Sequence, residues 1–246
     1  MNLHFLKLRV ADDPWLLIDW TSDSGDGPDW AAVAHELCHG VRGASASGLV
    51  VVERSDAGFV ASPWGRNGLP CPLEPSAALC TARWLFDTGR TNEESIAIRS
   101  RDGDYEAMVL DSRNFGLALG SMTVDGSPTA LMVALAGKTV PVRLFDGGLP
   151  SRRRSGGARE STPVVEVFAI ARHALRARRN GQDALAAAAA ALAASSTADF
   201  AEREATVGLG PDEVLVQWPE TGQVFVAAEA RYCFSGDFWA EERKRD

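Results

Sequence analysis

The segment His35-Glu36-Leu37-Cys38-His39 holds two histidines four residues apart, with a glutamate beside the first. On one helix this spacing places both imidazoles on the same face, as in zinc peptidases that use the glutamate as a general base. Residues 30–38, which Asp29 would cap, fit such a helix, but Gly40 ends it almost at once. A zinc metallopeptidase acting through His35, Glu36 and His39 is therefore one hypothesis, and metal analysis would test it.

A second group of reactive side chains precedes another expected helix. Pro75 and Ser76 open an apolar segment over 77–86, and Gly89 ends it. Glu74 stands at the start of this helix, where a carboxylate either stabilises the positive helix end or acts as a base. Cys71 lies three residues earlier and is a weaker alternative, because a lone loop thiol is usually inert.

The remaining pattern is rich in strands. We expect strands over 3–10, 15–19 and 49–53, and several more between 95 and 145. Loops are expected over 62–72, which is rich in Pro and Gly, and over 147–161, while 164–170 fits a strand or a helix. The alanine-rich segment 183–194 predicts a helix, since alanine loses least entropy there. A hairpin over 213–218 and 223–228, and a further strand over 231–239, complete an α+β chain in two comparable halves.

Composition narrows the classes of partner. The chain has 246 residues and a formal net charge of −8, which disfavours nucleic acid as a partner. Its four cysteines form no CxxC pair and do not make a disulfide framework. The N-terminal residues lack the apolar run of a signal peptide, and no segment approaches a membrane span. We therefore expect a cytoplasmic protein without a membrane partner.

Several segments match, in order and with consistent spacing, the motifs of one protein family. The first is Phe5 to Asp19, which follows an opening F-x-K-M pattern, with Asp13 at the family's substrate-binding Asn. The second is Leu37 to Glu53, where Gly43 and Gly48 are in register and Ser47 stands at an Asp. The others are Glu74 to Arg83 at the first catalytic motif, the Gly126 to Val133 segment, and the hairpin from Val214 to Gly222. Together these segments resemble the diaminopimelate epimerase family.

The resemblance implies a diaminopimelate epimerase-like fold. Such folds have two pseudo-symmetric halves, each a curved, mostly antiparallel sheet around a central helix. The N-terminal half would cover residues 1–120, with the last strand, about 231–240, returning to it, and the C-terminal half would cover 121–230.

The same resemblance shows what this chain lacks. In the family, one cysteine thiolate removes a proton and a second cysteine returns one from the opposite face, each cysteine lying at a helix N-terminus. Here Glu74 stands at the first cysteine position. The second cysteine position falls on Leu185 if the motif is placed by its spacing along the chain, or on Val164 if it is placed by similarity of the local sequence. Neither residue supplies a thiol. We therefore do not expect two-cysteine racemisation of diaminopimelate.

Three functional hypotheses follow. The first is a divergent member of this fold, either a pseudoenzyme that binds a small amino-acid-like or carboxylate ligand, or an isomerase with Glu74 as base. The resemblance extends to phenazine-pathway isomerases, which use one carboxylate at a similar place. The zinc peptidase is the second hypothesis, and a structural or partner-binding subunit is the third, suggested by the arginine-rich loop and the alanine helix. No cofactor is implied, and a homodimer is left open. The candidate substrate-binding residues are Asp13, Ser76, Ser127 and Thr129.

Overall fold

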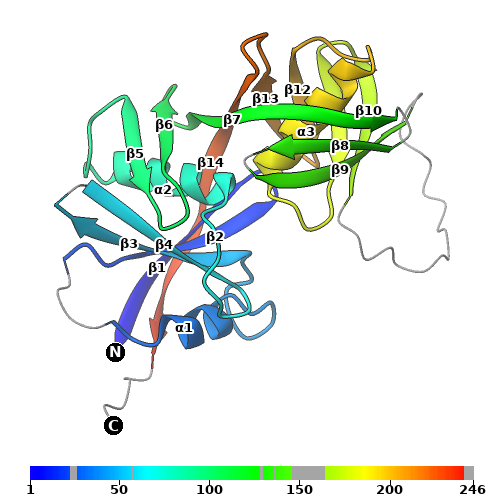
Figure 1. Ribbon diagram of the computed structural model, residues 1–246. Helices are drawn as coiled ribbons and strands as arrows, with labels where there is room; N and C mark the ends of the chain where they lie inside the picture. The colour runs from blue at the N-terminus through cyan, green and yellow to red at the C-terminus, as the bar shows by residue number, and fades with distance from the viewer. Residues whose placement is uncertain (23–26, 57, 128–129, 136, 146–163, 241–246) are drawn as a thin grey trace. The chain divides into compact units, whose positions relative to one another are not determined.

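The computed structural model describes residues 1–22, 27–56, 58–127, 130–135, 137–145 and 164–240 (Figure 1). Its helices are α1 (Trp30–Leu37), α2 (Pro75–Asp87) and α3 (Ala184–Thr197). Its strands are β1 (Asn2–Val10), β2 (Asp13–Asp19), β3 (Gly48–Ser55), β4 (Gly58–Gly65), β5 (Ser95–Arg99), β6 (Tyr105–Val109), β7 (Asn114–Ser127), β8 (Ala130–Leu135), β9 (Lys138–Phe145), β10 (Val165–Ala171), β11 (Ala174–Arg178), β12 (Glu204–Leu209), β13 (Asp212–Gln217) and β14 (Gln223–Trp239). None of the helices in the described ranges combines the length and the apolarity that crossing a bilayer requires.

The chain divides into two compact units. Unit 1 comprises Met1–Leu117 and Glu229–Asp246, and unit 2 comprises Ala118–Ala228. Strands β7 and β14 run from one unit into the other and pair with each other. Within each unit the other strands pair one after another from β7 to β14, so that the strands of the unit form a closed ring. Most of these pairings are antiparallel. The expected α+β class is thereby confirmed.

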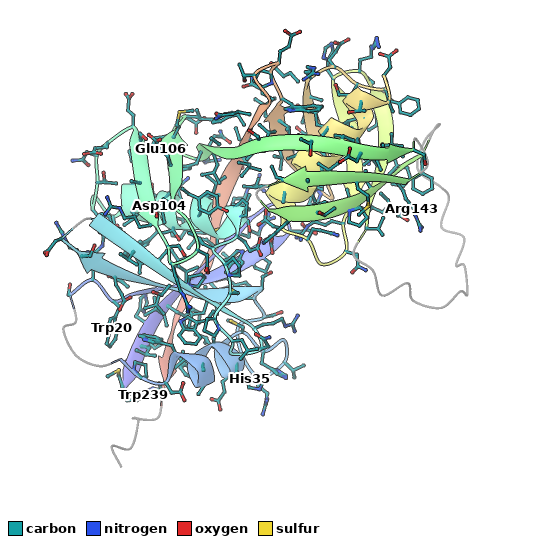
Figure 2. All side chains as sticks on the ribbon, in the orientation of Figure 1. Trp20, His35, Asp104, Glu106, Arg143 and Trp239 are labelled. Carbon is teal, nitrogen blue, oxygen red and sulfur yellow. The ribbon has the colours of Figure 1, made fainter. Side chains whose placement is uncertain are left out.

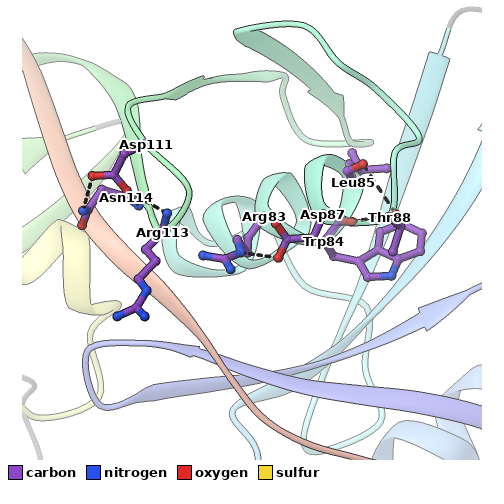
Figure 3. Close-up of polar contacts among 8 residues, drawn as sticks. All are labelled: Arg83, Trp84, Leu85, Asp87, Thr88, Asp111, Arg113 and Asn114. Carbon is purple, nitrogen blue, oxygen red and sulfur yellow. Dashed lines mark hydrogen bonds and ion pairs between the residues drawn. The ribbon is translucent and has the colours of Figure 1, made fainter.

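In unit 1 the strands surround α2. The strand order from β14 through β1 to β7 brings five of these strands into contact with this helix. Pro75 starts α2 at the position where a missing N–H costs least, and Gly89 follows its end with φ +65°. Figure 3 shows the last turn, where the Thr88 hydroxyl donates to the carbonyl of Trp84 and Arg83 pairs with Asp87. The helix is buried along most of its length.

The opposite face of the β1–β2–β3 layer is covered by α1. Asp29 caps this helix, as expected, by accepting hydrogen bonds from the backbone N–H groups of Ala31 and Ala32. The apolar face of α1 buries Val33, Ala34 and Leu37 in a core with residues from β1, β2 and β3. Unit 1 therefore has a sheet with helix on both faces, so its central strands read as nearly continuous apolar runs.

In unit 2 the strands surround α3 in the same way. Strands β8 to β13 all contact this helix. Asp183 caps it, and all the alanines that follow within the helix except the partly exposed Ala186 are buried, so no single face of the helix is the apolar one. The helix expected over 183–194 is thus confirmed, and it continues to Thr197. Alanine suits a helix enclosed by strands because its small side chain lets strands approach from all directions.

Two sequence expectations need correction, and one open alternative is decided. The segment 62–72 is not entirely loop, because β4 continues through Pro63 to Gly65. Proline is tolerated there because β4 pairs with β5 only at Phe59 and Val60, and the group that meets Pro63 is the N–H of Cys71, which donates to the Pro63 carbonyl and requires no donor from proline. The hairpin strand 223–228 and the final strand 231–239 are one continuous strand, β14. The segment 164–170, left open between strand and helix, is strand β10.

Candidate functional site

The start of α2 holds two of the candidate residues, Glu74 and Ser76. Glu74 is the N-cap residue in extended conformation (φ −77°, ψ 149°), and its side chain makes no capping hydrogen bond. It is half-buried, at the positive end of the helix dipole. Pro75 and Ser76, the next two residues, are buried, and the proline removes one of the N–H groups that such a helix end offers.

A buried hydrogen-bond network lies against this helix end. The indole N–H of Trp15 donates to the Ser76 hydroxyl at 2.9 Å, and Ser76 donates to one carboxylate oxygen of Asp13 at 3.1 Å. The hydroxyl of Ser47 donates to the other carboxylate oxygen of Asp13 at 2.6 Å. Asp13 is 5% exposed. Gly48 leaves room for this arrangement, since a Cβ there would lie 2.4 Å from the Trp15 ring.

Two departures from the family pattern therefore touch each other. Asp13 stands at the family's Asn, and Ser47 stands at the family's Asp, and the structure joins them by a short hydrogen bond. In the family pattern the carboxylate of this pair is at the position of Ser47, whereas in this chain it is at position 13. One acid remains in the pair, in keeping with the high cost of burying two carboxylates side by side.

The start of α3 is the equivalent position in unit 2. Asp183 is 8% exposed, and its carboxylate accepts from the N–H groups of Leu185 (2.9 Å) and Ala186 (3.0 Å). Leu185, the cysteine position by chain length, lies in the first turn of this helix. Val164, the alternative cysteine position from similarity of the local sequence, directly precedes β10. Both central helices thus begin with an acidic N-cap, but only Asp183 closes its own helix end.

Two binding candidates remain, Ser127 and Thr129. Ser127 is the last residue of β7 and is exposed, and it belongs to unit 2. Thr129 lies outside the described residues. Sequence reasoning had noted Ser47 only as a mismatch and had given Trp15 and Asp183 no role in the site. An acid directly before the alanine run was a sequence signal for the cap at Asp183.

The cysteines occupy different environments. Cys80 is buried in α2, and Cys233 is exposed on β14. Cys71 is partly exposed, and its backbone N–H donates to Pro63. Cys38 is fully buried at the end of α1, and burial raises its pKa to about 12, with Cys71 adding a smaller increase and Arg66 opposing it. Such a thiol stays protonated and unreactive at neutral pH.

The raised pKa of Cys38 predicts a loss of stability in alkaline solution. Its thiol keeps its proton in the folded chain up to about pH 12 but loses it near pH 9 in the unfolded chain. Each pH unit between these values should therefore remove about 1.4 kcal/mol of stability. Urea unfolding at pH 8.5 and 10.5 measures the loss, and Cys38→Ala should show a shallower decline. Equal slopes for the two chains would contradict the assignment.

The HExxH segment does not form the zinc arrangement. Helix α1 ends at Leu37, so His39 lies beyond it, and His35 is exposed on the helix surface (Figure 2). The Nδ1 of His39 accepts from the backbone N–H groups of Val41 and Arg42, at 3.1 and 3.2 Å. Among the described residues, no group of three or more His, Cys, Asp or Glu side chains could hold a metal ion. The predicted arrangement of His35 and His39 on one helix face is thus wrong, because α1 ends at Leu37, two residues before His39.

Known proteins resemble this chain both in sequence and in fold. The chain is 20% identical to the diaminopimelate epimerase of Pelotomaculum thermopropionicum (strain DSM 13744 / JCM 10971 / SI) over 276 residues, which cover 96% of this chain and 99% of that protein. Among solved structures it is similar to a phenazine biosynthesis protein of the PhzF family from Bacillus anthracis, with TM-score 0.72, 10% identity and coverage of 97% and 99%. It is also similar to a hydroxyproline epimerase from Agrobacterium vitis with bound trans-4-hydroxy-L-proline, with TM-score 0.61, 11% identity and coverage of 96% and 91%. No protein-family model matches the chain.

The chain thus has the diaminopimelate epimerase-like fold, as the sequence resemblance indicated. The full-length coverage extends this likeness to both units. Of the residues that the resemblance aligns with the family's reactive thiols, Glu74 is the N-cap of α2, and Leu185, one of the two alternatives for the second position, lies in the first turn of α3.

Proposed function

We propose that the protein is an isomerase that works with a single carboxylate, Glu74, in place of a pair of thiols. The observation that carries this proposal is the difference between the two helix starts. Asp183 is buried and bound to the N–H groups of α3, whereas Glu74 is half-buried at the start of α2 and does not cap it. This difference supports Glu74, rather than Asp183, as the acid that exchanges a proton with a ligand.

A single base restricts the chemistry. The Glu74 carboxylate would accept a proton from an acidic C–H group, and the resulting carboxylic acid would return that proton to the substrate. Because one group performs both steps, the proton returns on the face from which it left. This result is a shift of the proton to a neighbouring atom, rather than inversion at one carbon. A small amino-acid-like or carboxylic acid whose C–H is adjacent to an unsaturated group fits this chemistry.

Solvent exchange tests the proposal. In deuterium oxide, a panel of amino acids and unsaturated carboxylic acids should include at least one compound that gains deuterium, as measured by mass spectrometry. Glu74→Gln should lower that rate about 100-fold or more, because the amide cannot accept the proton. Cys71→Ala and Glu36→Gln should leave the rate unchanged, since neither side chain is assigned to the reaction. Exchange that survives in Glu74→Gln would overturn the role of Glu74.

A binding pseudoenzyme is the second candidate, and one observation favours it. The N–H groups at the start of α3 already bind Asp183, and the hydroxyl of Ser76 at the start of α2 already donates to Asp13. A helix end used by an internal carboxylate has less to offer the carboxylate of a substrate. This candidate predicts no exchange with any compound of the panel, together with saturable binding of one of them by calorimetry.

A further inference from the structure

The segment between α1 and β3 forms a compact loop around one histidine side chain. The Nδ1 atom of His39 accepts two hydrogen bonds, from the backbone N–H groups of Val41 (3.1 Å) and Arg42 (3.2 Å). The carbonyl of His39 accepts two more, from the N–H groups of Gly43 (3.0 Å) and Ser45 (3.3 Å). The polar groups of a single residue therefore hold most of the turn that follows α1.

Both hydrogen bonds at Nδ1 require a neutral imidazole. A backbone N–H group can only donate, so Nδ1 must present its lone pair and the ring proton must be on Nε2. A protonated imidazole is a donor at both nitrogens and cannot accept from either N–H group. Protonation of His39 therefore removes both bonds and places a positive charge against two donors. Histidine is also the side chain whose charge ordinarily changes between about pH 5 and 8.

The closed loop contains a strained residue. Ser45 has a left-handed backbone conformation (φ +53°), which a residue other than glycine adopts at an energetic cost. Lys7 of β1 supports this conformation, because its Nζ donates to the carbonyls of Ala44 (2.7 Å) and Ser45 (2.8 Å). At Gly43 a Cβ would lie 2.3 Å from the Leu37 carbonyl oxygen, so the loop touches the end of α1. A loop that holds a strained residue depends on its hydrogen bonds and opens when some of them are lost.

The loop leads directly to the candidate site. Ser47, at its end, donates its hydroxyl to Asp13 at 2.6 Å. Asp13 also accepts from Ser76, which in turn accepts from the indole N–H of Trp15. The strained residue Ser45 is only two positions before Ser47. A change of the loop conformation therefore reaches the hydrogen-bond network at the start of α2.

The parts of unit 1 that hold this loop carry charged and titratable groups around His39. These groups are His35 and Glu36 of α1, Cys38 and Arg42 of the loop, Lys7 of β1, and Arg66 after β4, whose backbone N–H donates to the carbonyl of Ser47. The Cys38 thiol is buried and uncharged. Three cations and one acid remain, so these surroundings oppose a further positive charge on His39 while the loop is closed.

We propose that this loop is a pH-sensitive switch, in which neutral His39 keeps Ser47 on Asp13 and protonated His39 releases it. At neutral pH the loop is closed and the network at the start of α2 is complete. On acidification the two bonds at Nδ1 are lost, the strained segment relaxes, and the Ser47 hydroxyl leaves Asp13. The buried carboxylate of the candidate site then lacks one of its donors. The switch does not depend on the reaction proposed for Glu74.

Two variants separate the acceptor at Nδ1 from the rest of the side chain. In His39→Asn the amide oxygen takes the place of Nδ1, accepts the same two bonds and does not titrate. In His39→Gln the amide is one carbon farther from the backbone, which takes the acceptor out of place. At pH 7.5, trypsin should cleave after Arg42 about tenfold faster in His39→Gln than in the wild-type chain or in His39→Asn. Mass spectrometry of the cleaved chains measures these rates.

Nuclear magnetic resonance follows the switch itself and decides the question even if His39→Gln folds poorly. Between pH 8 and 5, the amide signals of Val41 and Arg42 and the indole N–H signal of Trp15 should shift with one common midpoint. In His39→Asn they should stay in place, and His35→Asn, at an exposed histidine of α1, should behave as the wild-type chain.

Three results would contradict this proposal. Amide signals of Val41 and Arg42 that do not move in the wild-type chain would overturn the switch. Equal cleavage of His39→Asn and His39→Gln would overturn the role of the Nδ1 acceptor. Amide signals that move while the Trp15 signal does not would overturn the connection between the loop and the candidate site.

Discussion

Ser47→Asp is expected to destabilise the protein by about 2–3 kcal/mol, and Asp13→Asn in the same chain is expected to recover most of that loss. The first change puts a second carboxylate within hydrogen-bond distance of Asp13, which is 5% exposed. Two adjacent buried acids cannot both ionise without a large penalty, so one must take up a proton or the network must open. The second change restores a single acid and leaves an amide that can donate to it.

This exchange forms a double-mutant cycle that urea unfolding can measure. The coupling energy between positions 13 and 47 should be favourable by about 2 kcal/mol at pH 7, and it should shrink at pH 4, where carboxylates begin to protonate. Ser45→Asp is the matched control, because Ser45 lies in the same loop but is exposed. It should cost little with either residue at position 13. If Ser47→Asp is equally harmful in the Asp13→Asn chain, the two positions do not interact through charge.

Ala190→Leu in α3 should have the largest effect on unit 2, a loss of about 3 kcal/mol or failure of this unit to fold. Ala190 is fully buried in a helix that contacts strands on all sides, so three added carbon atoms have no space. Ala186→Leu is the matched control because Ala186 is partly exposed, and leucine and alanine both favour helix.

Hydrogen exchange read by mass spectrometry separates the two units in this experiment. Peptides from α3 and β12 should lose protection in Ala190→Leu, while peptides from α2 should keep it. Ala186→Leu should preserve protection in both units. Equal protection of α3 in the two variants would mean that the strands can move apart, and the explanation for the alanine sequence would then fail.

The sequence allowed prediction of features that depend on local chemistry. Alanine propensity predicted α3, and the order of Pro75 and Gly89 predicted both ends of α2. The continuity of β14 was missed because Glu229 and Arg231 are charged, while strand identity there comes from pairing with β1 and β13. Pro63 suggested a loop because proline cannot donate, yet its one contact there is the N–H of Cys71 donating to the Pro63 carbonyl, which requires no donor from proline.

The candidate site was predictable only in part. The position of Glu74 at a helix start followed from Pro75, and the structure places it there. The contact between Trp15 and Ser76 joins residues 61 positions apart, so nothing local in the sequence reveals it. The role of Ser47 depends on the orientation of the Asp13 carboxylate, which results from packing between β2, β3 and α2.

The pairing of β1 with β14 also bears on how the protein is made. Residues 2–10 are synthesised long before their partner strand, residues 230–239. Unit 2 is continuous in sequence, so it can fold before unit 1 receives this strand. The earlier part of unit 1 must therefore remain without its partner until residues 230–239 have left the ribosome, and until then the apolar side of α2 is open to chaperones.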